Sequence, residues 1–257
     1  MKFQLLPSTF DEKGCASARQ HLACFVIDDL VAIDAGSLAM AATPIQRKQI
    51  RDIVLTHAHL DHVAGLPLFV DDLFATLEEP IRIHATEKVI KVLERDIFNW
   101  DVYPSFCELE NDHGNVLQYR KIKAGREFQI KHLSIKPLKV NHKVPSVGFI
   151  ISDGKTKIAI SGDTAEPEDF WAGVNEEERL DYLLVECAFP DELDELAKAS
   201  HHFTPKLLKS EIAKLKHDCP IYVINIKPMY CEKVVSQIKD LQIENLDILE
   251  VGKVYNW

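Results

Sequence analysis

The sequence predicts an α/β fold in which two mixed sheets lie face to face with helices outside, an αββα sandwich. Short apolar runs separated by turn residues fill the first third of the chain, helical patterns follow, and the same order returns in the second half. A repeated order of strands and then helices indicates two similar halves, each with helices on a sheet. Because no linker or low-complexity segment interrupts residues 1–257, we expect a single domain.

The strands are predicted from short apolar runs that end at turn residues. Asp28 and Asp29 separate two such runs and predict a hairpin, and Asp153 with Gly154 predicts a second one. The predicted strands are 22–27, 30–33, 52–56, 81–84, 128–130, 133–138, 147–151, 157–160, 182–185 and 221–225.

The helices are predicted where apolar residues recur at intervals of three or four. In 62–76, for example, Val63, Leu66 and Phe69 share one face. Thr204 and Pro205 are suited to cap and start another helix. The predicted helices are 44–51, 62–76, 86–97, 167–174, 190–199, 204–217 and 230–241.

Composition limits the classes of function. The formal net charge of −10 argues against a protein that wraps DNA, because neutralisation of phosphates drives such binding. The six cysteines include no Cys-x-x-Cys pair and are expected to be reduced thiols. The chain starts without the apolar core of a signal peptide, and no segment approaches the ~20 apolar residues that span a bilayer. We therefore expect a cytoplasmic enzyme that binds neither DNA nor a membrane.

The most informative segment carries three imidazoles and a carboxylate, at His57, His59, Asp61 and His62, directly after the apolar residues 53–55. Imidazole suits zinc and iron, and a carboxylate oxygen helps to hold a second ion close by. The two histidines that follow the strand would project together from its end, and the other two ligands fall where a helix can begin. The spacing differs from the His-Glu-x-x-His helix of metalloproteases.

Three later segments offer further ligands. His142 follows an extended run, Asp163 follows the apolar strand 157–160, and His202 precedes the helix that Thr204 would cap. Each residue alone is also compatible with a capping or structural role. Together with the histidine cluster, His142 and Asp163 become candidate metal ligands, and His202 offers an imidazole beside the amides of a helix start. The neighbouring His201 is expected to face solvent.

The sequence resembles the metallo-β-lactamase superfamily, and within it the class II cyclic-nucleotide phosphodiesterases and the ribonuclease Z branch. The His-x-His-x-Asp-His core is typical of the whole superfamily, whereas Glu-Cys-x-Phe-Pro and His-Phe-Thr-Pro point to the phosphodiesterase branch. The resemblance covers nearly the whole chain. The segments that carry it are Asp34–Ser37, 55–68, Phe98–Trp100, Tyr103–Pro104, Ser161–Thr164, Glu186–Pro190, His202–Pro205 and Ile226–Pro228.

By this resemblance we expect two divalent ions, zinc or else manganese or iron. The family pattern has a histidine at the position that Asn225 occupies here. An amide oxygen is a poorer zinc ligand than an imidazole, so the second site is expected to be weak, absent, completed by water or filled by another metal. The implied ligands are His57, His59 and His142 for one ion, Asp61 and His62 for the second, and Asp163 between them, with Asn225 as a doubtful addition.

The implied activity is metal-dependent hydrolysis of 3′,5′-cyclic nucleotides such as cyclic AMP or cyclic GMP. In a two-metal site a bound water is acidified to hydroxide, which attacks phosphorus. His202, oriented by Glu186, would protonate the leaving alkoxide or bind phosphate. The implied catalytic residues are Asp61, His202 and Glu186.

Three aromatic residues, Phe98, Trp100 and Tyr103, are candidates to stack on a purine base, although aromatic clusters are also common core or lid material. A small-molecule nucleotide is the expected partner, and a homodimer is left open. One alternative function is a ribonuclease Z-like RNA 3′-end nuclease. Another is a degenerate protein that binds a nucleotide or one metal without catalysis, because of Asn225. Ester or amide hydrolysis shares the histidine cluster but gives no reason for His-Phe-Thr-Pro.

Overall fold

The computed structural model describes residues 1–257, and the chain divides into two compact units. The first contains Met1–Ser17, His21–Lys123 and Val251–Trp257. The second contains Ala18–Gln20 and Ala124–Glu250. Each unit has one seven-stranded sheet with both parallel and antiparallel pairs, which confirms the predicted α/β class with two mixed sheets.

The sheet of the first unit has the order β16-β1-β2-β3-β4-β5-β8. It is antiparallel from β16 to β3 and parallel from β3 to β8. The outer pair β1 and β16 was not predicted. These strands come from opposite ends of the chain, where the amino group of Met1 donates to the carbonyl of Trp257 at 2.6 Å. The strands are β1 Lys2–Leu5, β2 Phe25–Ile27, β3 Val31–Ile33, β4 Asp52–Val54, β5 Ile81–Thr86, β8 Leu117–Ile122 and β16 Val254–Asn256.

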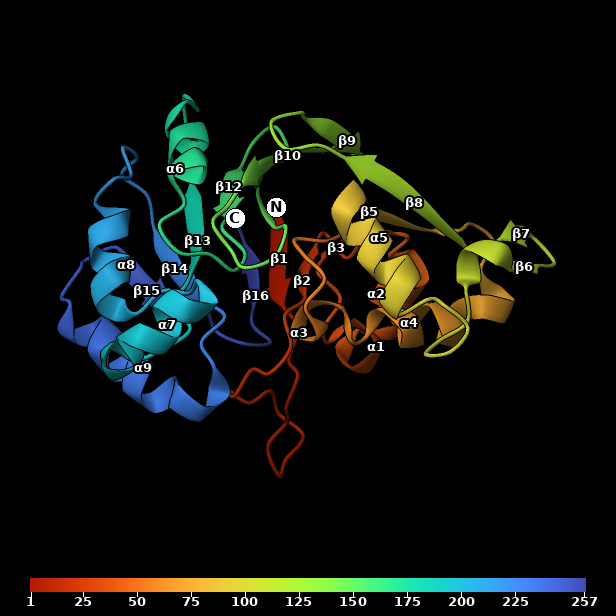
Figure 1. Ribbon diagram of the computed structural model, residues 1–257, viewed down its shortest axis with the longest axis horizontal. Coiled ribbons are helices and arrows are strands. Elements are labelled where there is room, and N and C mark those ends of the chain that lie inside the picture. Colours follow the sequence, from red (N-terminus) through yellow and green to blue (C-terminus); the bar gives the residue numbers. More distant parts are fainter. The chain divides into compact units, whose positions relative to one another are not determined.

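The helices α1, α4 and α5 share one hydrophobic core with this sheet, and α5 lies alongside β5 and β8 (Figure 1). The predicted helix 62–76 is in fact divided into α3, α4 and the 3₁₀ turn η1. It breaks at Gly65, whose amide donates to the carbonyl of Ala35 at 3.1 Å. The remaining elements are α1 Leu38–Ala41, α2 Pro44–Gln49, α3 Leu60–Val63, α4 Leu66–Leu73, η1 Phe74–Thr76, α5 Glu87–Asp96, η2 Phe106–Glu108, β6 Glu110–Asn111 and β7 Gly114–Asn115.

The sheet of the second unit has the order β15-β14-β13-β12-β11-β10-β9. It is antiparallel from β9 to β12 and parallel from β12 to β15, so it repeats the division of the first sheet. The predicted turn at Asp153 and Gly154 is confirmed between β11 and β12. The strands are β9 Phe128–Ile130, β10 Leu133–Lys139, β11 Val147–Ser152, β12 Lys157–Ile160, β13 Tyr182–Glu186, β14 Ile221–Ile224 and β15 Leu246–Ile248.

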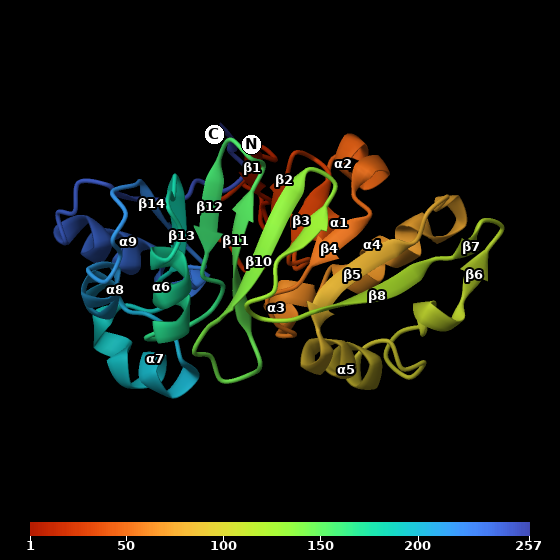
Figure 2. The ribbon, with the colours of Figure 1, turned by 90° about the horizontal axis from the view of Figure 1, so that it is seen from above.

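Helices α6, α8 and α9 cover one face of this second sheet (Figure 2). As predicted, Thr204 caps α8, since its hydroxyl accepts from the amide of Leu207, and Pro205 is the first helical residue. The helix ends at Ile212, earlier than expected. The helices are α6 Glu168–Asn175, η3 Asp191–Leu193, α7 Asp194–Ser200, α8 Pro205–Ile212, η4 Pro228–Tyr230 and α9 Cys231–Asp240. No helix has the length and apolar character to cross a membrane.

Polar residues follow the parallel strands of both sheets. In the first unit, Asp34 comes after β3 and His57 comes shortly after β4. In the second, Asp163 follows β12, Glu186 ends β13 and Asn225 follows β14. Ligands of α/β proteins commonly bind at the carboxyl ends of parallel strands. Each sheet therefore presents its candidate residues at the edge where such sites form.

A partly buried ion pair joins β4 to β5. Arg82 donates to Asp52 through Nε at 2.7 Å and Nη2 at 2.8 Å, and Nε2 of His84 lies 2.8 Å from the same carboxylate. Burial acts to raise the pKa of Asp52, but the hydrogen bonds from Arg82 and His84 outweigh it and hold this pKa well below its usual range. The ionised form of Asp52 thus contributes to stability.

This pair predicts an acid-sensitive contribution to folding. The contribution is complete above the unfolded pKa of about 4 and is lost as the pH falls through the lowered folded pKa. We expect Asp52→Asn to reduce the free energy of unfolding at pH 7 by about 2 kcal/mol and to flatten its decline in acid. Urea unfolding at pH 7 and pH 3 measures the free energy of unfolding and its decline in acid. Glu79→Gln, which changes an exposed partner of Arg82, is the control, and equal effects of the two variants would contradict the prediction.

Candidate metal centre

Four candidate ligands gather in the first unit. His57 and His59 lie between β4 and α3, and their ring centroids are 4.6 Å apart. The ring of His62 on α3 lies 4.2 Å from that of His57. Asp61 places Oδ2 4.0 Å from Nε2 of His62. The structure therefore brings together all four residues of the predicted histidine cluster.

Close backbone contacts hold this loop in place. Ala23 donates its amide to the carbonyl of Asp61 at 2.8 Å, and Ala35 donates to the carbonyl of His62 at 2.7 Å. The chain can approach so closely because position 36 is glycine. A Cβ atom on Gly36 would lie 2.0 Å from the carbonyl oxygen of Asp61.

Asp34 and Thr56 determine which ring nitrogen carries the proton in two of these histidines. Oδ2 of Asp34 lies 2.7 Å from Nδ1 of His62, so that Nδ1 donates to the carboxylate. The hydroxyl of Thr56 donates to Asp34 at 2.8 Å and can therefore accept from Nδ1 of His57 at 2.9 Å. When these rings are neutral, as metal binding requires, Nε2 is the nitrogen with a lone pair for a metal.

A second set of candidate residues lies in the second unit. The ring centroids of His142 and His202 are 5.1 Å apart. Ligand atoms of Asp163, Glu186 and His202 lie within 4.8 Å of one another, and all three side chains are buried. The structure thus places these predicted residues together as well.

Glu186 is an orienting group, because its carboxylate is already satisfied by N–H donors. Oε1 accepts from the amide of Thr164 at 2.7 Å and from Nδ1 of His202 at 2.7 Å. Oε2 accepts from the amides of Ala188 at 3.1 Å and Phe203 at 3.2 Å. Four donors around one carboxylate hold it in a single orientation, and with it the ring of His202.

The charges of this pair follow from the same contacts. Burial opposes a charge on His202, but the Glu186 carboxylate outweighs burial and raises the pKa of the ring. Burial also raises the pKa of Glu186, against the influence of His202. A carboxylate that accepts four N–H groups is best described as ionised. We therefore assign the negative charge to Glu186 and the proton to His202.

Asn225 contacts the candidate bridging ligand. Its backbone is left-handed, with φ at 56°, and its Nδ2 donates to Oδ1 of Asp163 at 2.7 Å. The amide nitrogen, rather than the amide oxygen, thus faces the carboxylate. In this arrangement Asn225 supports Asp163 through the Nδ2 hydrogen bond, and its amide oxygen does not face that carboxylate.

The two sets have the chemistry of a metal site. In each of four histidines, Nδ1 contacts an acceptor supplied by the protein. For His142 this acceptor is the carbonyl of His201, at 3.1 Å. Metal-binding histidines are typically held in this way, which leaves Nε2 as the ligand atom. The histidine and aspartate clusters are therefore consistent with a metal site, and their imidazole and carboxylate donors suit zinc or a related divalent ion.

The three candidate aromatic residues lie in different environments. Phe98 is buried in the core of the first unit, 5.9 Å from the ring of Phe106. Tyr103 also packs against Phe106 and donates its hydroxyl to Asp71 at 3.1 Å. Trp100 is 56% exposed and has a left-handed backbone with φ at 69°. Of the three, Trp100 presents the most accessible ring for a base to stack on.

Four residues that contact the candidate ligands or their neighbours have no role predicted from the sequence: Asp34, Thr56, Asn141 and His201. His201, which was expected to face solvent, is half-buried, and its ring contacts Asn141 at 2.9 Å. A local signal existed for Asp34 and Thr56, because each is a polar residue at the end of an apolar strand. No local signal marked the contact made by the carbonyl of His201, because every residue has a backbone carbonyl and the residue type does not indicate which one contacts a ligand.

Comparison with known proteins agrees with this architecture. The family model described as "Beta-lactamase superfamily domain" matches residues 28–220. The chain belongs to the metallo-β-lactamase superfamily. Its fold matches the unliganded structure of yeast PDE1 with a TM-score of 0.76 at 15% identity, over 98% of this chain and 97% of that one. It also matches the metallo-beta-lactamase fold protein YhfI from Bacillus subtilis, with a TM-score of 0.73 at 15% identity, over 99% of both chains.

Distant relatives of this superfamily member include cyclic-nucleotide phosphodiesterases and ribonuclease Z. A probable 3′,5′-cyclic-nucleotide phosphodiesterase of Yersinia pestis is 28% identical over 213 residues, which cover 72% of this chain and 60% of the relative. A nuclear ribonuclease Z of Triticum aestivum is 29% identical over 115 residues, 44% of this chain and 61% of the relative. The aligned part of the chain thus spans about 60% of the length of these relatives.

Proposed function

We propose that this protein is a metal-dependent phosphodiesterase that hydrolyses 3′,5′-cyclic nucleotides. The observation that carries the proposal is the buried pair of Glu186 and His202 beside Asp163, which provides an oriented acid next to a candidate metal ligand. Membership of a superfamily of hydrolases and the phosphodiesterase relatives support the reaction class. The cyclic nucleotide as the substrate is proposed together with the reaction class.

The proposed metal ligands follow the family resemblance. In the first unit, Nδ1 of His57 and of His62 each contacts a hydrogen-bond acceptor of the protein. In the second unit, Nδ1 of His142 does the same. Bound metal ions would neutralise charge on the phosphoryl oxygens and acidify a water molecule. The proposed ligands are His57, His59, Asp61, His62, His142 and Asp163.

His202 would act as the general acid. It keeps Nδ1–H on Glu186 and gives the proton on Nε2 to the leaving ribose oxygen. The negative charge of Glu186 stabilises the protonated ring before the transfer. The hydrogen bond from Nδ1 to Glu186 keeps the ring from rotating. A satisfied, immobile carboxylate lowers the cost of placing the acid correctly.

Hydrolysis assays on the metal-loaded protein test the proposal. Cyclic AMP, cyclic GMP and an activated phosphodiester should each be examined, with the bound metal measured in the same sample. Turnover of a cyclic nucleotide is the expected result. No turnover of any of these substrates by protein that contains metal would refute the function. Cleavage of precursor tRNA, without activity on cyclic nucleotides, would replace it with a ribonuclease Z-like activity.

The contact between Asn225 and Asp163 predicts incomplete metal loading. After loading with excess metal and dialysis, we expect about one retained ion per chain, and an increase toward about two in Asn225→His, because an imidazole adds a ligand that the amide does not supply. Metal analysis of both proteins after dialysis gives the stoichiometry. Asn225→Ala, which removes the amide without adding a ligand, is the matched control. Two tightly held ions in the unmodified protein would show that Asn225 does not limit loading.

A further inference from the structure

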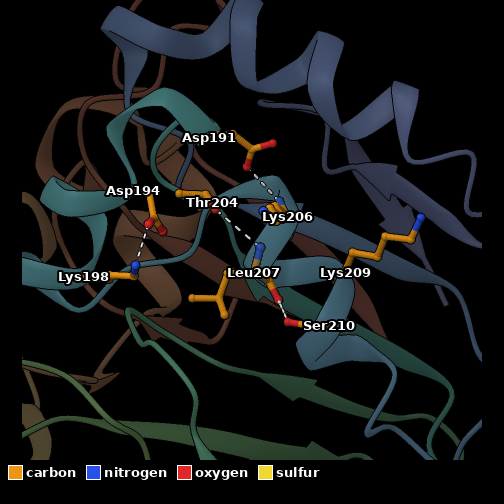
Figure 3. Close-up of a pocket in the computed structure, with 8 residues that line it drawn as sticks. All are labelled: Asp191, Asp194, Lys198, Thr204, Lys206, Leu207, Lys209 and Ser210. Carbon is orange, nitrogen blue, oxygen red and sulfur yellow. Dashed lines mark hydrogen bonds and ion pairs between the residues drawn. The ribbon is translucent and has the colours of Figure 1, made fainter.

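Helix α7 has little apolar anchorage in the second unit. Its buried residue Ala197 belongs to a small cluster with Ala188 and Phe189, separate from the main core of this unit. On the side toward α8 lies a groove of about 580 Å³ (Figure 3). The groove is lined by Asp191, Asp194, Lys198, Thr204, Lys206, Leu207, Lys209 and Ser210. The buried apolar packing of α7 is therefore limited to this small cluster.

The carboxyl end of α7 is a left-handed turn formed by a residue other than glycine. His201 has φ at 57° and ψ at 64°, and the amide of His202 donates back to the carbonyl of Ala197 at 2.9 Å. Glycine is the common residue at this position of a helix end, because a side chain disfavours the left-handed conformation. Here a histidine takes its place, and both its ring and its carbonyl make specific contacts.

These two contacts reach neighbouring residues in another loop. Nδ1 of the His201 ring lies 2.9 Å from Oδ1 of Asn141. The carbonyl of His201 lies 3.1 Å from Nδ1 of His142. A carbonyl oxygen only accepts hydrogen bonds, so Nδ1 of His142 must be the protonated nitrogen. Nε2 then carries the lone pair.

The backbone beside His142 is fixed independently. The amide of Asn141 donates to the hydroxyl of Thr164 at 3.0 Å, and the amide of Ala165 donates to the carbonyl of Asn141 at 2.9 Å. The position of the loop is therefore maintained by the segment that carries Asp163. The orientation of the His142 ring is a separate matter, to which the carbonyl of His201 contributes, beside the edge contact with the ring of His202.

We propose that His201 is a positioning residue for His142, because its left-handed backbone turns its own carbonyl onto Nδ1 and so selects Nε2 as the metal-binding atom. The ring of His201, anchored on Asn141, holds this turn in place. The effect on metal binding rests on the proposed function, in which His142 is a ligand. The effect on the protonation of the His142 ring does not depend on the proposed function.

Two measurements on the full chain test the proposal. Histidine ¹⁵N spectra of the metal-free protein report which nitrogen of His142 is protonated, and competition with a chelator reports zinc affinity. A β-branched residue strongly disfavours a left-handed backbone, so His201→Val should increase the Nε2–H form and weaken zinc binding by about 10- to 100-fold. His201→Asn tolerates this backbone but lacks the ring contact with Asn141, so its zinc affinity should lie between those of the unmodified protein and His201→Val.

The remaining variants separate the possible failures. Asn141→Ala removes the anchor of the His201 ring without altering the backbone of α7, and it should shift the protonation of His142 in the same direction even if His201→Val does not fold. An unchanged Nδ1–H form in both variants would overturn the proposal. His142→Ala tests the ligand role alone. If it binds zinc as tightly as the unmodified protein, the proposed ligand set is wrong, while a changed protonation in His201→Val would still establish the positioning role.

Discussion

Replacement of His202 by alanine is expected to reduce kcat for cyclic-nucleotide hydrolysis by about 10²- to 10⁴-fold, the usual contribution of a general acid. The physical reason is the loss of the proton that Glu186 holds on the ring in a buried environment. The bound metal should remain, because the role assigned to His202 is proton transfer. Steady-state kinetics with metal analysis of the same sample measure both quantities. Loss of metal together with activity would contradict the assignment as an acid.

Glu186→Gln is the companion variant, since it retains the shape of the side chain and removes its charge. The Glu186 carboxylate raises the pKa of His202, so its neutralisation should lower that pKa. An acid must be protonated to act, and activity therefore declines as the pH rises through this pKa. The decline should begin at a lower pH in the variant. An identical pH profile for kcat would show that the pair does not set the protonation of the acid.

The second large effect is expected at Gly36. Substitution by alanine places a Cβ atom 2.0 Å from the backbone carbonyl of Asp61, and two further backbone atoms of Ala23 lie within 2.9 Å. Backbone cannot rotate away as a side chain can, so the loop that carries the histidine cluster must move. We expect a loss of about 3 kcal/mol in the free energy of unfolding, measured with urea, together with weaker zinc binding.

Gly173→Ala provides a matched control for this substitution. The new Cβ would lie 2.7 Å from Leu138, but the obstructing atom is the end of a flexible side chain. Gly173 also lies within α6, where alanine is the better helix former. The change in stability should be less than about 1 kcal/mol. If the two variants were equally destabilised, the close approach of the backbone at Gly36 would not be the cause.

Strands with a clear local pattern could be predicted, and strands without one could not. Residues 30–33 and 157–160 are apolar runs next to turn residues, and both contain strands of the structure. Lys2–Leu5 and Val254–Asn256 are short, contain polar residues and have no turn between them. They form strands because they lie beside each other in the sheet, at Lys2 with Asn256 and Phe3 with Tyr255. Such pairing depends on contacts that a sequence window does not include.

The candidate ligands could be predicted from the sequence, because imidazoles and carboxylates at the ends of predicted strands are typical of metal sites. The break in the predicted helix 62–76 was less accessible. It occurs at Gly65, where a Cβ would lie 2.6 Å from the carbonyl of Ala35. The spacing of apolar residues continues through the break. A helical pattern therefore extended across a position that the neighbouring backbone requires to be glycine.

The sequence by itself determined the type of site: a dense set of nitrogen and oxygen ligands on an α/β scaffold, with the motifs of a hydrolase superfamily. Only the tertiary structure decided which nitrogen of each ring is available. His62 contacts Asp34, 28 residues away, and His142 contacts the carbonyl of His201, 59 residues away. A ring nitrogen is protonated according to its nearest acceptor, and the identity of that acceptor depends on folding. The ligand chemistry is thus local, whereas its orientation is a property of the folded chain.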